Sequence, residues 1–153
     1  MKVYLASGFF NPKQVALVDA IEAMATEMNL VLYSPRRDGP GTLKDMTPEE
    51  RAAIAPRIFA ENCYEVERAD LVFAVIDVRD VGVIWEMGYA HGVGTPIVSF
   101  SNENFGMNVM MKGCVKKHIL GVDRLRAFFA DLSAHGYRAI DVEPDGDAHP
   151  VVT

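Results

Sequence analysis

Two kinds of segment follow one another along this chain: short runs of apolar residues, and longer segments in which apolar residues recur at helical spacing. The apolar runs predict five strands, at residues 2–6, 30–34, 71–77, 96–100 and 117–120. Apolar residues recur at helical spacing in segments that begin after Asn11, after Thr47, near Val81 and near Asp123. Asn11 and Thr47 are residue types that commonly cap helices, and Glu50 completes a capping box with Thr47.

Strands and helices therefore alternate, which is typical of an α/β fold with a parallel, doubly wound sheet. Five strands fit the flavodoxin-like (Rossmann-like) three-layer sandwich with the strand order 2-1-3-4-5. Two segments are expected to be irregular, residues 35–46 and residues 101–113, the second with one short helix. The tail, residues 137–153, gives no clear element, and we expect residues 1–153 to form a single domain.

Charge and cysteine content exclude several classes of protein. The net charge of −6 and the pI of about 5.1 argue against binding to nucleic-acid phosphates or to an anionic membrane, but not against a nucleobase and sugar. Cys63 and Cys114 are too few for a disulfide framework, and no Cys/His cluster suggests a metal. No apolar run reaches the ~18 residues of a membrane span and no leader is evident, so we expect a cytoplasmic protein.

The predicted topology places a ligand site at the carboxyl ends of the central strands. Ligands of open α/β sheets bind beyond the carboxyl ends of the strands, where the strand order reverses. Here those ends are "YLASGFF" after the first strand and "DVRDVG" after the third. Two acids, Asp80 and Glu86, should converge there with Tyr4, Ser7 and Gly8.

Each of these residues also has an ordinary structural explanation. Near the start of a helix, Glu86 is favoured by the helix dipole, which would also keep it ionised as a nucleophile requires. Asp80 is a preferred N-cap residue, and Tyr4 can be a core aromatic. Arg36 and Arg37 are either solvated or available to a phosphate. The glycines of "GYAHGVG" end a helix and do not open one, so we expect no dinucleotide cofactor.

Four segments together resemble the nucleoside 2-deoxyribosyltransferase family. They are "VYLASGFF", "ENCYEVERADLVFAVID", "DVGVIWEMGYAHGVGTPIV" and "NFGMNVMMKG", which occur in the family's order over about the first 120 residues. The resemblance implies covalent glycosyl transfer with retention of configuration, like that of a retaining glycosidase. Glu86 would attack the anomeric carbon of a 2′-deoxynucleoside, Asp80 would protonate the leaving base, and Tyr4 would orient Glu86. A free nucleobase would then accept the sugar.

The resemblance also implies a set of substrate contacts and an assembly. The substrate-binding positions are Ser7, Gly8, Phe10, Asp38, Asn62, Asp77, Gly82, Asn108 and Met110. Asn108 and Met110 match positions that reach into a neighbouring subunit's site, which implies a homo-oligomer built from dimers, such as a hexamer. Two features depart from the pattern: Asn62 stands where the best-known bacterial members carry Asp, and the tail lacks their aromatic C-terminus.

Two other functions fit parts of the same pattern. A 2′-deoxynucleoside 5′-monophosphate N-glycosidase would use the same Glu with water as acceptor, but it needs a phosphate cradle. Such relatives carry a Ser at the position of Asp80 and an Arg in the turn after the first strand, where this chain has "SGFFNPKQ". A non-enzymatic nucleotide- or flavin-binding module would make no demand on Glu86, so a Glu86→Ala variant would keep its ligand affinity.

Overall fold

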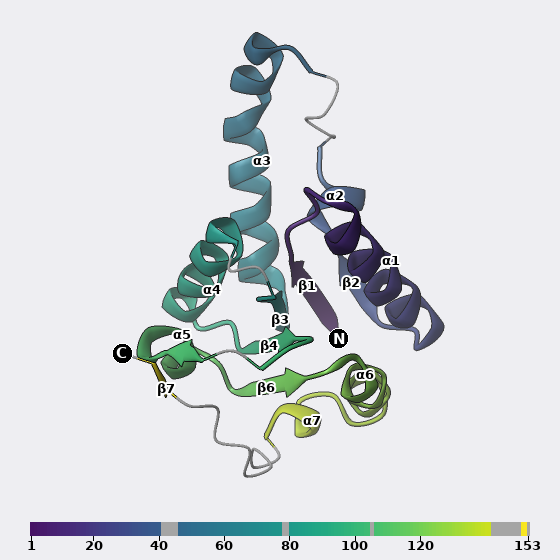
Figure 1. Cartoon of the computed structure of the whole chain (residues 1–153). Helices are drawn as coiled ribbons and strands as arrows, with labels where there is room; N and C mark the ends of the chain where they lie inside the picture. The colour runs from purple at the N-terminus through teal and green to yellow at the C-terminus, as the bar shows by residue number, and fades with distance from the viewer. Residues whose placement is uncertain (41–45, 78–79, 105, 142–150, 153) are drawn as a thin grey trace.

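The five predicted strands form one parallel sheet, as expected from the sequence. The computed structural model describes residues 1–40, 46–77, 80–104, 106–141 and 151–152. The strand order is β2-β1-β3-β4-β6, which confirms the predicted order, and the strands occupy the centre of the molecule (Figure 1). Their bounds are β1 Lys2–Ala6, β2 Val31–Tyr33, β3 Leu71–Val75, β4 Ile97–Ser101 and β6 Lys117–Leu120. The two short strands β5 (Met107–Asn108) and β7 (Val151–Val152) form a separate parallel pair.

Helices cover both faces of this sheet. One face carries α1 (Pro12–Glu27), α6 (Val122–His135) and α7 (Arg138–Asp141), and the other carries α3 (Pro48–Arg68), α4 (Val81–Val93) and α5 (Val109–Cys114). The two groups lie on opposite sides of the strands in Figure 1. A short helix, α2 (Pro35–Asp38), follows β2.

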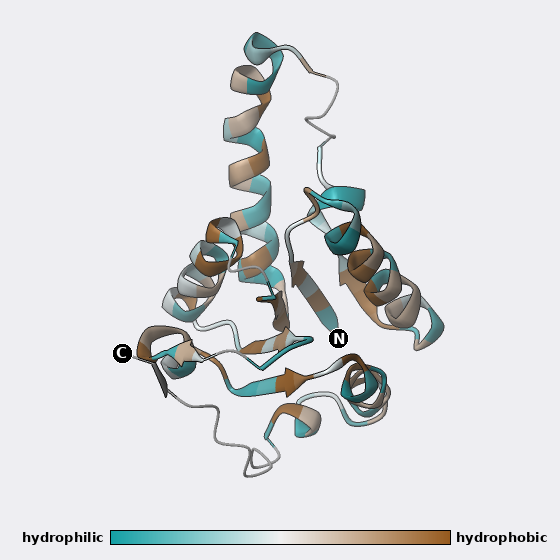
Figure 2. Ribbon diagram, viewed as in Figure 1, coloured by the Kyte–Doolittle hydropathy of each residue, from teal (hydrophilic) through white to brown (hydrophobic). Residues whose placement is uncertain are grey.

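The alternation of side chains along each strand divides the core into two clusters. On β1, Val3 and Leu5 point toward α1 and α6, while Tyr4 and Ala6 point toward α3 and α4. All four are at most 1 % exposed. All five residues of β3 and all five of β4 are buried, as expected for the central strands of a parallel sheet that is covered on both faces, whereas hydrophilic residues are visible on β6 (Figure 2).

The predicted helix starts are confirmed. Asn11 and Thr47 each accept a backbone N–H of the first turn in a complete capping box. Asp80 is the N-cap of α4, which ends at Gly94 in the left-handed conformation (φ 85°) that glycine adopts without strain.

One long helix is only partly covered by the rest of the chain. The buried residues of α3 are Glu65 and Val66, near its carboxyl end. Its residues 48–60, here called the α3 arm, include no buried side chain, and they project beyond the sheet in Figure 1.

The structure corrects several expected boundaries. The third strand ends at Val75 and not at Asp77, because the chain turns before that acid. The segment after β2, expected to be irregular, begins with α2, since Pro35 suits a first helical position and Asp38 binds the Ser34 N–H. The tail, which gave no clear element, contributes α7 and β7, while residues 142–150 lie outside the described residues. Within the described chain, no helix is both long and apolar enough to cross a membrane.

Candidate active site

The chemistry of the site centres on a hydrogen bond between Tyr4 and Glu86. The Tyr4 hydroxyl donates to Glu86 Oε1 at 2.5 Å, and this contact joins β1 to α4. Glu86 lies three residues after Val83 and four before Ala90, both of which are buried, so the helix directs it toward the sheet. Tyr4 itself is 0 % exposed. A carboxylate at the sheet edge is thereby held in place by a core residue.

Burial, and then the negative charge of Asp80, raises the pKa of Glu86 to about 7, although the bond from Tyr4 opposes this rise. The expectation that the helix dipole keeps Glu86 ionised is therefore wrong. Glu86 is the sixth residue of α4, beyond the first turn where the dipole acts. Near neutral pH the carboxyl is poised between its two protonation states, so its charge depends strongly on pH.

Tyr4 is locked in its protonated form. Burial and the adjacent Glu86 carboxylate raise the pKa of the Tyr4 hydroxyl far above its usual value of 10. The hydroxyl therefore remains a hydrogen-bond donor throughout the physiological pH range. Because it occupies Oε1 of Glu86, the other carboxylate oxygen is the one left for a substrate.

Asp80 uses one carboxylate oxygen to cap α4, while its other oxygen faces the turn after β1. Its Oδ1 accepts the backbone N–H groups of Gly82 at 2.8 Å and Val83 at 3.2 Å, which confirms the N-cap interpretation. Its Oδ2 faces the turn after β1, where a Cβ atom on Gly8 would lie only 3.1 Å away. The absence of a side chain at Gly8 therefore lets the first strand approach the second acid.

A cavity of about 620 Å³, lined by both polar and apolar groups, opens on the α1 side at the carboxyl ends of the strands. It is lined by Ser7, Gly8, Asn11, Lys13, Gln14, Leu17, Val75, Asp77, Asn102, Glu103 and Asn104. Three predicted substrate-binding residues, Ser7, Gly8 and Asp77, belong to this lining, whereas Glu86 does not. Gly8 lines the cavity and also lies beside Asp80 Oδ2, so this glycine is the link between the cavity and α4.

Asp77 fixes the loop that follows β4. Its two carboxylate oxygens accept the Asn102 backbone N–H at 2.5 Å and the Asn102 side-chain amide at 2.9 Å. Asp77 thereby links the ends of β3 and β4 at the rim of the cavity. Asp77 lies two residues beyond the end of β3, and its direct contact with substrate stays a prediction.

The helix α3 carries Asn62 and Cys63, and the charge of Glu86 acts on the Cys63 thiol. The Asn62 side-chain oxygen is buried and has no hydrogen-bond partner among the described residues. An unpaired buried acceptor is costly, so this oxygen is suited to a donor from a ligand. Burial is the main cause that raises the pKa of the Cys63 thiol, which keeps it protonated and unreactive.

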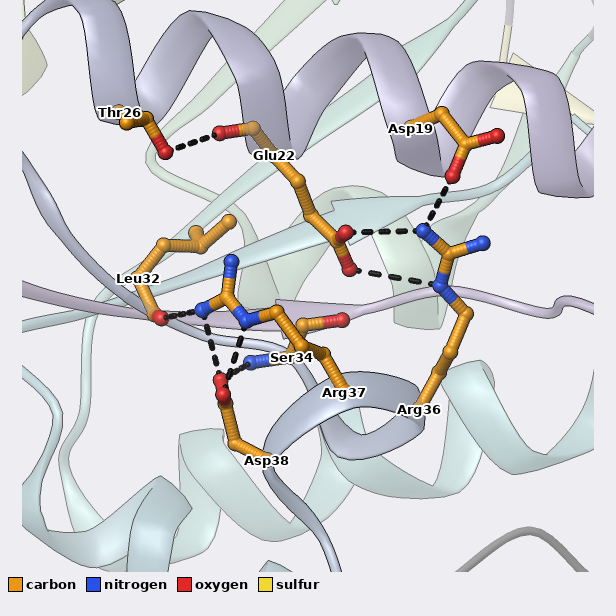
Figure 3. Close-up of polar contacts among 8 residues, drawn as sticks. All are labelled: Asp19, Glu22, Thr26, Leu32, Ser34, Arg36, Arg37 and Asp38. Atoms are coloured by element: carbon orange, nitrogen blue, oxygen red, sulfur yellow. Dashed lines mark hydrogen bonds and ion pairs between the residues drawn. The ribbon is translucent and has the colours of Figure 1, made fainter.

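The two arginines after β2 are already neutralised by carboxylates (Figure 3). Arg36 donates to Asp19 Oδ1 at 2.5 Å and to Glu22 Oε2 at 2.8 Å, both on α1. Arg37 donates to both oxygens of Asp38 and to the Leu32 carbonyl. Both guanidinium groups are thus committed to holding α2 against its neighbours.

Asp38, a predicted substrate-binding residue, belongs to this structural network. Burial would raise its pKa, but the hydrogen bonds from Arg37 and from the Ser34 N–H outweigh that effect and lower it. Asp38 is therefore a fixed anion that caps a short turn. A contact between Asp38 and substrate stays a prediction.

Three further predicted residues lie on the surface. Phe10 is 75 % exposed and stacks on Phe9, and Met110 is 78 % exposed on α5. Asn108 caps α5, its Oδ1 accepting the Met111 N–H at 2.9 Å. Within the part of the chain that the structure describes, no hydrogen bond joins these three residues to Tyr4 or Glu86. Their proposed roles therefore depend on a bound ligand or on a second subunit.

Two neighbours of the site did not emerge from the sequence patterns. Tyr33 stacks on Tyr4 from the adjacent strand, with ring centroids 5.7 Å apart. The Gln14 side chain accepts the Phe10 and Asn11 N–H groups and thereby holds the turn after β1. The Asn11–Gln14 spacing is a capping-box signal that could have revealed Gln14, whereas Tyr33 required the register of β1 and β2. Within the described ranges no cluster of three or more His, Cys, Asp or Glu could hold a metal.

Comparisons with known proteins identify the family of this chain. The sequence profile described as nucleoside 2-deoxyribosyltransferase matches residues 3–136, which span every residue of the site described above. This match defines an enzyme that acts on nucleosides. The chain belongs to the nucleoside 2-deoxyribosyltransferase family. Among curated protein sequences, none matches this chain at a significant level.

Solved structures show the same fold at low sequence identity. A 2-deoxyribosyltransferase from Bacillus psychrosaccharolyticus is 23 % identical with a TM-score of 0.74, over 94 % of this chain and 98 % of that one. A conserved protein from Enterococcus faecalis V583 is 18 % identical with a TM-score of 0.64, over 83 % and 95 %. The CMP N-glycosidase BcmB of Clostridium botulinum is 15 % identical with a TM-score of 0.55, over 78 % and 88 %. Transferase and glycosidase thus share this architecture.

Proposed function

We propose that this chain exchanges the nucleobase of 2′-deoxynucleosides by covalent transfer of the deoxyribosyl group through Glu86. The observation that carries the proposal is the bond from Tyr4, which occupies one carboxylate oxygen of Glu86 and leaves the other to react. Membership of the family supplies the substrate class. No cofactor takes part in the proposed reaction.

In the first half-reaction, the free oxygen of ionised Glu86 attacks C1′ of the donor. The bond between C1′ and the base nitrogen breaks, and its electron pair leaves with the base, which takes a proton from Asp80 or from water delivered by it. The sugar is left as an ester of Glu86. In the second half, a nitrogen of the acceptor base attacks C1′ and gives its proton to Asp80 or to the water that Asp80 holds, the Glu86 carboxylate departs, and two inversions give net retention.

The charge around the site supports a nucleoside as substrate more than a 5′-monophosphate. Arg36 and Arg37, the two arginines that could have formed a phosphate cradle, are both paired with carboxylates. Asp80 holds a carboxyl group beside Gly8, where a phosphate-binding relative would need a neutral or positive group. A desolvated phosphate dianion next to that acid would be repelled by several kcal/mol, on the scale of the Coulomb estimate at an effective ε of about 20.

We also infer that the working form is a homo-oligomer in which Asn108 and Met110 complete a neighbour's site. Two exposed aromatic residues, Phe59 of α3 and Trp85 of α4, support an interface on that side of the molecule. Their rings are in contact, and Trp85 also stacks on the half-buried Tyr89. Large exposed apolar groups of this kind are enriched where proteins associate.

A base-exchange assay tests the proposed reaction. Deoxyinosine incubated with free adenine and the protein, without added phosphate, should yield deoxyadenosine. Glu86→Gln should abolish this exchange and leave nucleoside binding measurable by calorimetry. If free deoxyribose appears at the same rate with and without adenine, the chain is a hydrolase; if deoxyribose 1-phosphate forms on adding phosphate, it is a phosphorylase.

A further inference from the structure

The ring of Tyr33 lies flat against the ring of Tyr4, the residue that binds Glu86. The two residues are paired in register on the parallel strands β2 and β1. Their ring centroids are 5.7 Å apart and their planes are 17° apart, an offset-stacked arrangement that is favourable for aromatic pairs. Both rings point to the α3 and α4 side of the sheet.

The two flanks of Tyr4 are unequal. On the β3 side its register partner is Val72, a small aliphatic residue, whereas on the β2 side it is the tyrosine. β2 is the edge strand of the sheet, so no further strand restrains the Tyr4 ring on that side. A broad aromatic face at position 33 therefore limits rotation of the Tyr4 ring about its Cα–Cβ bond more than an aliphatic side chain would.

The hydroxyl of Tyr33 does not explain why an aromatic residue stands there. It is buried and has no hydrogen-bond partner among the described residues. Burial, and then the carboxylates Glu61, Glu65 and Asp38, raise its pKa to about 12, so it is neutral in the physiological range. The ring is the part of Tyr33 that makes the specific contact.

We propose that Tyr33 is a positioning residue whose ring holds the Tyr4 phenol in the orientation from which it donates to Glu86. Tyr33 acts through Tyr4 and has no contact of its own with the reacting atoms. This role rests on the proposed function for its effect on turnover, but not for its effect on the Glu86 carboxyl, which is present in the free protein.

The role predicts a change that simple loss of packing would not produce. The groups that face Glu86 are Tyr4 from β1, Asp80 from the start of α4 and Cys63 from α3. Of these, only Tyr4 lowers the pKa of Glu86. If the phenol loses its orientation, the pKa of Glu86 must therefore rise, and the acid limb of the pH–rate profile must move to higher pH.

The experiment compares Tyr33→Phe with Tyr33→Leu. Tyr33→Phe keeps the ring, so kcat should stay within about twofold of the wild-type value. The pH of the acid limb should not change. Tyr33→Leu should lower kcat by about three- to tenfold with KM nearly unchanged, and should shift the acid limb upward. Carbon-13 NMR of the Glu86 carboxyl in the free protein should show the same upward shift, and this readout needs no activity.

Two controls separate positioning from packing. Val72→Ala removes a contact from the other flank of Tyr4 and should lower the melting temperature without moving the Glu86 titration. In Tyr4→Phe protein, adding Tyr33→Leu should change neither kcat nor the titration further, because the bond is already absent. Tyr33→Met, with a flexible side chain of similar length, replaces Tyr33→Leu if the latter does not fold.

An unchanged Glu86 titration in Tyr33→Leu or Tyr33→Met overturns the proposal, and so does a full shift in Tyr33→Phe. A wild-type protein that exchanges no bases refutes the proposed function instead, and leaves the NMR comparison as the test of Tyr33.

Discussion

Asp80 is the N-cap of α4 and Glu86 is its sixth residue, and the charge of the Asp80 carboxyl raises the pKa of the Glu86 carboxyl. After burial, the charge of Asp80 is the cause that raises the pKa of Glu86 toward 7, while Tyr4 lowers it. The same Asp80 holds the start of α4 through two backbone N–H groups. The geometry of the helix start and the pKa of Glu86 are thus coupled through one side chain.

Replacing Asp80 with Asn should therefore separate these two roles. Asn caps helices about as well as Asp, so the fold should be kept. Removing the charge should lower the pKa of Glu86 and move the acid limb of the pH–rate profile to lower pH. Turnover should fall by ~10²–10⁴-fold, because an amide can neither give a proton to the leaving base nor take one from the acceptor base. An acid limb that does not move would show that Asp80 does not influence Glu86.

Glu86→Gln should raise stability at alkaline pH. The folded pKa of about 7 lies above the usual 4.5, so the folded protein binds the proton more tightly than the unfolded chain does. This contribution to stability is fully present below pH 4.5 and is lost as the pH rises through 7. The variant should match the wild type near pH 5 and exceed it by roughly 3 kcal/mol near pH 9. Urea unfolding at both pH values measures this, with the exposed Glu103→Gln as the control that should show no such difference.

Subunit complementation tests whether Asn108 serves a neighbouring site. Glu86→Gln and Asn108→Ala proteins should each be nearly inactive alone. After mixing and exchange of subunits, some sites would combine an intact Glu86 with an intact Asn108, and base exchange should return to as much as about a quarter of the wild-type rate, the share that random pairing in dimers gives. Trp85→Asp should lower the molar mass seen by sedimentation. Activity that does not return, in proteins that do exchange subunits, would place Asn108 in the site of its own chain or in none.

Arg36 should matter for stability and not for substrate choice. Arg36→Ala breaks the contacts with Asp19 and Glu22 and should cost about 1–2 kcal/mol of unfolding free energy, less at high salt. Arg36→Lys keeps the charge but not the bidentate geometry, so its unfolding free energy should lie between those of the wild type and Arg36→Ala. The ratio of kcat/KM for deoxynucleosides over their 5′-monophosphates should stay unchanged in both. A selective loss of the nucleotide reaction in Arg36→Ala would identify a phosphate ligand.

Most of the fold could be predicted because its signals are local. The apolar runs gave all five strands of the sheet, and the capping residues Asn11 and Thr47 gave the helix starts. The exact strand ends could not be read, because Asp77 follows the apolar run without a turn signal. The elements of the tail depend on tertiary contacts, such as the pairing of Val151 with Met107, which no local pattern reveals.

The candidate site divides in the same way. The convergence of Tyr4, Gly8, Asp80 and Glu86 follows from topology alone and was expected. The protonation of Glu86 was not, because burial and the distance of its sixth helical position from the dipole appear only in three dimensions. Likewise, the arginines of "SPRRDG" read as free cations until their partners on α1 and α2 are known.

The two faces of the central sheet differ in the side chains that they carry. Below the cavity at the carboxyl ends of the strands, the side toward α1 and α6 is filled by aliphatic and phenylalanine side chains such as Leu5, Phe73 and Phe100. The opposite side carries the tyrosines and the acid that we place at the centre of the reaction. A library that diversifies only these packed apolar positions would tune thermal tolerance while leaving turnover alone. Selection for new donors or acceptors would have to draw its useful variants from the opposite side and from the lining of the cavity.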